Sequence, residues 1–178
     1  MSVLLLAETS GDALVRDATA RAVRAVSGLG EVTLLVAGAG LSAAAGEAAR
    51  IDGVSKVLVA DADALSHRLA EATAELIVTL AGDYDVIAAP ATSDGKNILP
   101  RVAARLDVMI ISDVTAILDA ETFDRPIYAG NAIQTVKSRD PVRVVTIRTS
   151  GFEAAGEDGA APIEQVSASD ATVDAKWV

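Results

Sequence analysis

Short apolar runs alternate with stretches of helical periodicity along the first 112 residues. The run from Val3 to Ala7 reads as a buried strand, and the next stretch places Leu14, Ala22 and Val26 on one helical face. By the same criteria we expect strands at residues 3–7, 32–37, 56–60, 86–89 and 108–111, and helices at residues 12–29, 42–51, 65–81 and 98–106. Repeated strand–helix–strand units make right-handed crossovers, so the pattern predicts an α/β fold: a mostly parallel, twisted sheet with helices on both faces.

The pattern changes after Ser112. Four strand-like runs, at residues 114–118, 126–129, 133–137 and 142–148, follow one another with no helical stretch between them. Local antiparallel pairing is the simplest arrangement for such runs, and Gly130 with Asn131 forms an expected hairpin turn. We therefore expect some antiparallel strands near the C-terminal end.

Periodicity is lost from Gly151 onward. Residues 151–178 carry six acids against one base, a charge of −5, and the 150 residues before them carry the same charge. We expect an α/β domain at residues 1–150 and an acidic linker or arm at residues 151–178, in which only Trp177 resembles an anchor.

Composition then narrows the class of protein. The chain is 51% hydrophobic, its mean hydropathy is +0.38, and its 178 residues suffice for one substantial core. No apolar run approaches the ~20 residues that cross a bilayer, and the opening residues lack the features of a signal peptide. We therefore expect a soluble cytoplasmic protein without membrane insertion. A formal charge of −10 argues against nucleic acid as a partner.

Several kinds of chemistry are excluded or disfavoured. Cysteine is absent, so disulfides and thiolate metal sites are excluded, and the single histidine, His67, makes a zinc site an unfavourable interpretation. His67 lies in an expected helix, where a surface or boundary position is the simpler interpretation. No nucleophile and general base lie close in sequence, and we predict no catalytic residue.

One motif matches the dinucleotide-binding pattern G-x-G-x-x-A. Gly38, Gly40 and Ala43 follow the second strand, and Asp61 follows the next strand at about the offset of a ribose-binding acid. However, the motif follows the second strand and not the first, and Ala/Gly-rich sequence produces such matches by chance. A plain strand-to-helix turn is therefore favoured over an NAD site.

The most informative stretch joins the strand at 86–89 to a helix through Thr92, Ser93, Asp94, Gly95, Lys96 and Asn97. Such a loop lies at the carboxyl edge of a parallel sheet, where backbone N–H groups and the helix dipole favour phosphate. We expect the helix to begin near Asn97, because Pro100 then falls in its first turn. An ordinary capped helix explains the same residues, and the two interpretations stay open at this point.

Several segments together resemble the N-terminal domain of the electron transfer flavoprotein alpha subunit. The resemblance rests on segments throughout the chain: VLLLAE (3–8), LLVAG (34–38), KVLVAD (56–61), GKNILPRVAARLDVMIISDV (95–114), RPIYAGNAIQTVK (125–137) and TIRTSGFEAA (146–155). It implies an adenine-nucleotide alpha-hydrolase-like sheet. It also implies a heterodimer with a beta subunit, holding one FAD, that carries electrons from acyl-CoA and other dehydrogenases to a quinone oxidoreductase and the quinone pool.

The same resemblance implies that the main FAD site belongs to a C-terminal domain beyond residue 178, so this chain is the scaffolding and subunit-interface part. AMP is expected in the beta subunit and not here. The positions that match its nucleotide cradle are Ala7, Ala37, Gly38, Ala60, Ala89, Pro90, Asp94, Gly95, Lys96 and Asn97. We expect the Asp94–Asn97 loop to be a relic of a nucleotide site. The alternative is a stand-alone adenine-nucleotide-binding module that resembles the universal stress proteins.

Overall fold

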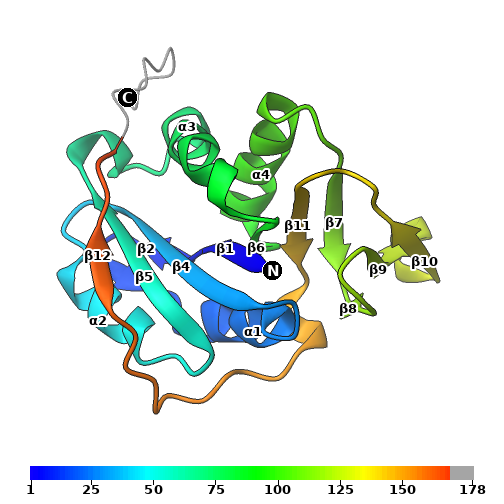
Figure 1. Ribbon diagram of the computed structural model, residues 1–178, viewed down its shortest axis with the longest axis horizontal. Coiled ribbons are helices and arrows are strands. Elements are labelled where there is room, and N and C mark those ends of the chain that lie inside the picture. Colours follow the sequence, from blue (N-terminus) through cyan, green and yellow to red (C-terminus); the bar gives the residue numbers. More distant parts are fainter. Residues whose placement is uncertain (169–178) are drawn as a thin grey trace.

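A seven-stranded parallel sheet organises the chain, and the computed structural model describes residues 1–168 (Figure 1). Trp177 lies outside this range. The strands of this sheet are β1 (Ser2–Leu6), β4 (Glu31–Gly38), β5 (Val54–Asp61), β6 (Val86–Pro90), β7 (Ile110–Val114), β11 (Arg143–Ile147) and β12 (Ile163–Gln165). Their spatial order is β12-β5-β4-β1-β6-β11-β7, and every neighbouring pair is parallel.

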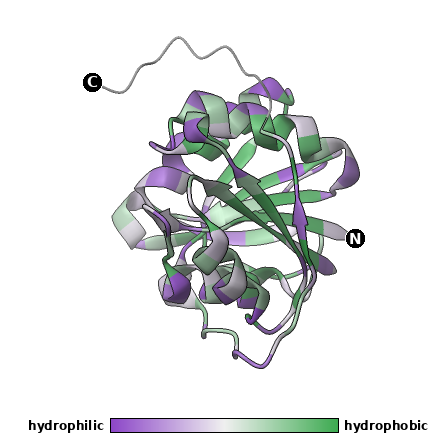
Figure 2. Ribbon diagram, turned by 90° about the vertical axis from the view of Figure 1, so that its left-hand side faces the viewer, coloured by the Kyte–Doolittle hydropathy of each residue, from purple (hydrophilic) through white to green (hydrophobic). Residues whose placement is uncertain are grey.

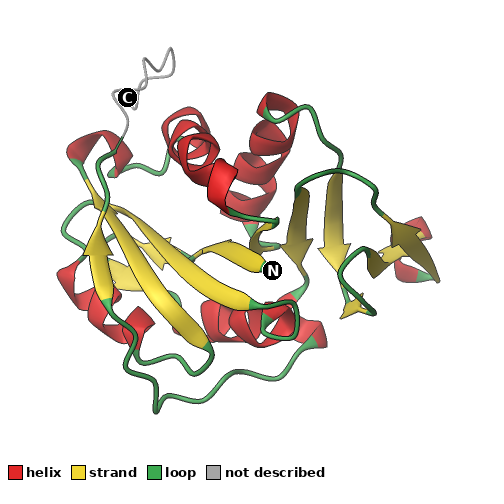
Figure 3. Cartoon of the chain, in the orientation of Figure 1, coloured by secondary structure: helices red, strands yellow, loops and turns green. Residues whose placement is uncertain are grey.

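Helices cover both faces of this sheet (Figure 3). They are α1 (Arg16–Val26), α2 (Ser42–Ala49), α3 (Ala70–Leu80) and α4 (Ser93–Arg105). Side chains alternate along β1, so Val3 and Leu5 pack with α1 and α2, whereas Leu4 and Leu6 pack with α3 and α4. In Figure 2 the strands of the sheet are mostly hydrophobic, whereas the helices on either side of it mix hydrophobic and hydrophilic residues. The predicted mostly parallel, doubly covered sheet is confirmed.

Smaller antiparallel sheets complete the fold. The strands β8 (Ala116–Ile117), β9 (Thr122–Ile127) and β10 (Ala132–Lys137) form a three-stranded sheet beside β7, and β2 (Thr9–Ser10) pairs with β3 (Ala13–Leu14). The expected hairpin around Gly130 joins β9 to β10. Antiparallel strands near the C-terminal end are thereby confirmed.

The strand β11 departs from the expected local pairing. It does not join β10 but enters the large sheet between β6 and β7, where Val144 lies opposite Ile87 on one side and Ile110 on the other. Its apolar run Val144–Ile147 is buried, which is typical of an internal parallel strand. The prediction that this segment pairs with the strand just before it in the chain was therefore wrong.

Three helices begin at different residues from those expected, and α3 is one of them, since it begins at Ala70 and not at residue 65. The β2–β3 hairpin, which turns at Gly11 with a φ of 62°, delays α1 until Arg16. The helix α4 begins earlier, at Ser93, because the Thr92 hydroxyl caps it by accepting from the Gly95 N–H at 3.3 Å. Pro100 therefore lies inside α4, on its exposed side, and not in its first turn.

The part of the predicted arm that the structure describes lies against the domain. Ala155 and Ala161 pack on the core beneath α1 and α2, and β12 pairs with β5 from Ile163 to Gln165. The arm as a connection to a further domain stays a prediction. Within residues 1–168, no helix has the length and apolar character needed to cross a membrane.

Candidate functional site

The crevice at the carboxyl ends of β1 and β6 is the place where a sheet of this order binds ligands. The strand β1 lies between β4, which follows it in the chain, and β6, so the strand order reverses at β1 and β6. In open parallel sheets, ligands enter the crevice at this point of reversal. The helix α4 begins at the end of β6, which brings its first turn to the same edge.

The side chain of Arg68 occupies this crevice. It comes from the turn before α3, its backbone φ is +49°, and only 11% of the side chain is exposed. Its Nε donates to Asp94 Oδ2 at 2.6 Å, and Nη1 donates to the Thr9 hydroxyl. The guanidinium also donates to the carbonyl oxygens of Ala7 and Ala37, each at 3.4 Å. One cation thus connects the ends of β1 and β4 with the first turn of α4.

Glu8 lies at the same edge, directly after β1. The Thr92 hydroxyl donates to its Oε2 at 2.8 Å, and its backbone N–H donates to the Thr19 hydroxyl at 3.1 Å. Burial raises the pKa of Glu8, while the bond from Thr92 and the charge of Arg68 lower it by smaller amounts. The crevice therefore holds a carboxyl group and a guanidinium that belong to the chain itself.

The four residues of the expected relic loop lie in the first turn of α4 and do not converge on one point. Asp94 faces the crevice and binds Arg68, whereas Lys96 forms an ion pair with Asp113 at 3.1 Å. Gly95 is buried against β6, and Asn97 is exposed. This geometry is that of a capped helix with one carboxylate turned toward the crevice.

Gly95 serves close packing between helix and strand. A Cβ atom at this position would lie 2.0 Å from the Pro90 carbonyl oxygen and 3.3 Å from the Ala89 side chain. The missing side chain lets α4 approach the end of β6, and the space that it leaves is filled by protein.

The turn formed by the G-x-G-x-x-A motif is likewise occupied by a side chain of the protein itself. The backbone N–H groups of Gly40 and Leu41 donate to the Asp61 carboxylate at 2.8 and 3.0 Å. In a dinucleotide site such N–H groups would face a pyrophosphate, and the acid would face a ribose. Because Asp61 caps the turn itself, the geometry favours the plain strand-to-helix turn.

Sequence reasoning missed Arg68 and Glu8. Arg68 follows His67 in a stretch expected to be helical from residue 65, but α3 begins only at Ala70. The position of Glu8 could have been predicted, because a charged residue directly after a buried strand lies at the carboxyl edge of the sheet. Among residues 1–168, no three or more Asp, Glu or His side chains are grouped so that they could hold a metal ion.

Comparison with known proteins adds a family to this geometry. The model of the electron transfer flavoprotein domain matches residues 3–171. The chain is similar to the electron transfer flavoprotein subunit alpha of Paracoccus denitrificans, with 63% identity over the whole chain and 58% of that protein. The Pseudomonas aeruginosa subunit alpha is 50% identical over 94% of the chain and 54% of its own length. A probable mitochondrial subunit alpha of Caenorhabditis elegans is 39% identical over 97% of the chain and 53% of its own length. The chain thus spans a little over half the length of these relatives.

Proposed function

Because the chain belongs to the electron transfer flavoprotein family and aligns with the N-terminal part of its alpha subunits, we propose that it is the scaffolding and subunit-interface domain of such a subunit. Its proposed partner is a beta subunit. The proposed heterodimer holds one FAD and carries electrons in the cytoplasm from acyl-CoA and other dehydrogenases to a quinone oxidoreductase. In this proposal the main FAD site belongs to a part of the subunit beyond residue 178.

The observation that carries the proposal is the Arg68 side chain in the crevice between β1 and α4. A nucleotide there would have to displace a guanidinium that is bound to Asp94, Thr9 and two strand-end carbonyls. At the neighbouring turn it would have to displace Asp61 from Gly40 and Leu41. The described residues therefore do not fit FAD or AMP at this edge. This supports a structural role for the domain and a relic nucleotide site.

Flavin content tests the proposal directly. The purified 178-residue chain is expected to show no flavin absorbance near 450 nm, whereas the full alpha subunit coexpressed with its beta subunit is expected to be yellow. Titration of the chain with AMP, followed by calorimetry, is expected to show no binding heat. A chain that retains one flavin per molecule through purification would contradict the scaffolding role.

The same titration separates the alternative of a stand-alone adenine-nucleotide-binding module. That function requires micromolar binding of AMP or ATP that is lost in Asp94→Ala. Asp94 is engaged by Arg68 in the structure, so its geometry gives this alternative no support.

A further inference from the structure

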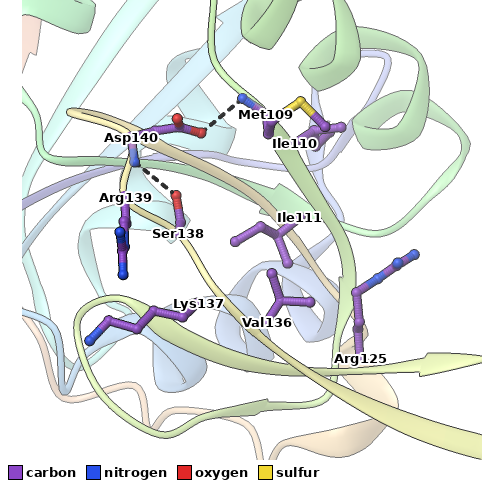
Figure 4. Close-up of a pocket in the computed structure, with 9 residues that line it drawn as sticks. All are labelled: Met109, Ile110, Ile111, Arg125, Val136, Lys137, Ser138, Arg139 and Asp140. Carbon is purple, nitrogen blue, oxygen red and sulfur yellow. Dashed lines mark hydrogen bonds between the residues drawn. The ribbon is translucent and has the colours of Figure 1, made fainter.

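A pocket of about 340 Å³ lies where the large sheet meets the small one, far from the Arg68 crevice along the strand order (Figure 4). One wall is the beginning of β7, the last strand of the large sheet, with Met109, Ile110 and Ile111. The facing wall includes Val136 of β10, whose side chain lies opposite that of Ile111 in Figure 4. Such a size and an apolar lining are typical of a site that accepts a side chain or a small ligand.

The rim of this pocket is cationic, in a chain whose formal charge is −10. Arg125, Lys137 and Arg139 line it together with one acid, Asp140. Asp140 is already engaged, because its Oδ2 accepts from the backbone N–H of Met109 at 2.9 Å. In Figure 4 the side chains of Lys137 and Arg139 extend on the same side of the pocket. The rim therefore favours an anionic group beside an apolar one.

These cations are available to a partner to different degrees. Arg139 is exposed and makes no hydrogen bond or ion pair with residues 1–168. Lys137 forms an exposed pair with Glu121 at 3.3 Å, which solvent weakens. The guanidinium of Arg125 is held by Ser112, where Nε donates to the carbonyl oxygen and Nη2 to the hydroxyl, both at 2.9 Å. Two exposed cations thus stand beside one that is held by hydrogen bonds.

Exposed apolar side chains lie both at the pocket and at the tip of the β9–β10 hairpin. Arg125 and Ile127 lie on one face of β9, since side chains alternate along a strand. Met109 at the pocket is 74% exposed, and Tyr128 at the tip is 82% exposed. Exposed Met, Tyr and Arg side chains are enriched in protein interfaces.

The hairpin tip has an unusual backbone that fixes this surface. Tyr128, Ala129 and Gly130 have consecutive φ values of +51°, +51° and +88°. The amide group of Asn131 locks the turn, because its Nδ2 and its backbone N–H both donate to the Tyr128 carbonyl at 3.0 Å. Non-glycine residues in the left-handed region cluster at functional sites, where the conformation holds a side chain in place.

From these observations we propose that the junction pocket and the hairpin tip form the docking surface for the beta subunit, and that the pocket receives an acidic segment carrying an apolar side chain. This inference rests on the proposed function, because it names the contact surface of the proposed heterodimer. The exposed cations Lys137 and Arg139, together with the exposed side chains of Met109 and Tyr128, favour an acidic protein segment over a free metabolite.

Charge reversal tests the docking surface. The 178-residue chain is bound to immobilised beta subunit, and the double variant Lys137→Glu/Arg139→Glu is expected to raise the Kd about tenfold or more at low salt. Met109→Glu is expected to weaken binding similarly. Because Met109 is 74% exposed, the variant is expected to keep its fold, which circular dichroism checks. The salt dependence of binding is expected to shrink in the double variant, since fewer ion pairs form.

A matched control is available on the other side of the molecule. Arg24 and Arg50 are exposed on α1 and at the end of α2, and Arg24→Glu/Arg50→Glu changes the net charge by the same amount. This variant is expected to keep the Kd of the wild type within about threefold. If the pocket variants bind as tightly as this control while the wild type binds, the docking surface lies elsewhere and the inference fails. A wild-type chain that does not bind the beta subunit at all contradicts the proposed function as well.

Discussion

Arg68 binds groups on several separate elements. Without its side chain, these elements would line an open crevice. The guanidinium carries donors in a planar fork, which lets one side chain serve a carboxylate, a hydroxyl and strand-end carbonyl oxygens together. Its backbone has a φ of +49°, a conformation that costs a non-glycine residue on the order of 1 kcal/mol. The side-chain contacts offset this cost, so the residue stabilises the crevice in a closed form.

Substituting Arg68 separates the side-chain contacts from the backbone cost. We expect Arg68→Ala to lower the free energy of unfolding by about 2–3 kcal/mol, because Asp94 and the strand-end carbonyls lose their donor. Arg68→Gly is expected to lose roughly 0.5–1 kcal/mol less than Arg68→Ala, since glycine adopts a positive φ without steric cost. Urea denaturation followed by circular dichroism measures both.

Arg24→Ala serves as the control for loss of a cation. Arg24 is exposed, and its substitution is expected to change stability by no more than about 0.5 kcal/mol. A glycine variant less stable than the alanine variant would show that the backbone at Arg68 is not strained.

Among the elements, α4 illustrates how tightly helix and sheet are fitted at the crevice. Gly95 lies in its first turn, directly above the end of β6, while Lys96 reaches across to β7 through Asp113. The capping hydroxyl of Thr92 also donates to Glu8 after β1. The start of α4 therefore contacts the ends of β1 and β6 and forms an ion pair with β7.

A pair of glycine substitutions tests this fit. We expect Gly95→Ala to destabilise the chain by roughly 2 kcal/mol or more, because the new Cβ would lie 2.0 Å from the Pro90 carbonyl oxygen. Gly46→Ala, within α2 and with no atom near the new Cβ, is expected to gain about 0.5–1 kcal/mol from helix propensity. Thermal and urea unfolding measure the difference. Equal effects at the two positions would mean that α4 can move away from β6 without cost.

The elements also show where sequence patterns are sufficient and where they are not. The strands of the first half were predictable because each is a short apolar run followed by a helix. The start of α4 was predicted wrongly, because Pro100 favoured a late start, whereas the local cap between Thr92 and Gly95 sets an early one. The place of β11 depended on pairing with β6, more than 50 residues earlier, which no local pattern encodes.

At the scale of the whole molecule, residues 151–168 act as a strap along one side. Gly159 and Ala161 donate backbone hydrogen bonds to Arg50 and Ala49 at the end of α2. β12 then covers the edge of β5, and Lys56 pairs with Glu164 across that contact at 3.3 Å. Without the strap, β5 would be an exposed apolar edge strand, which is prone to association.

Truncation tests the strap. A chain that ends at Phe152 loses β12, and we expect a melting temperature lower by roughly 5–10 °C, as for a loss of a few kcal/mol. We also expect concentration-dependent association in size-exclusion chromatography, because β5 becomes an unpaired edge. A chain that ends at residue 168 retains β12 and is the reference for the melting temperature. A stable monomer ending at residue 152 would show that the strap contributes little.

The site was less predictable than the sheet, for a physical reason. The position of Asp94 at the carboxyl edge of the sheet was predicted from the alternation of strands and helices. The crevice, however, is filled by the side chain of Arg68, which lies in a turn that was expected to be helical. Arg68 and Asp94 are 26 residues apart, and their contact depends on a backbone conformation that an arginine seldom adopts. Such a contact becomes visible only in three dimensions.

The insertion of β11 between β6 and β7 also determines an order of assembly. The strands β5, β4, β1 and β6 pair among themselves and can do so once about the first 90 residues have been synthesised. Among residues 1–168, the strand β7 pairs within the large sheet with β11 alone, and β11 ends at residue 147. Contacts this distant in sequence form late. On a ribosome, β7 therefore gains its strand partner in the large sheet only after β11 emerges, and one short strand joins β7 to β6.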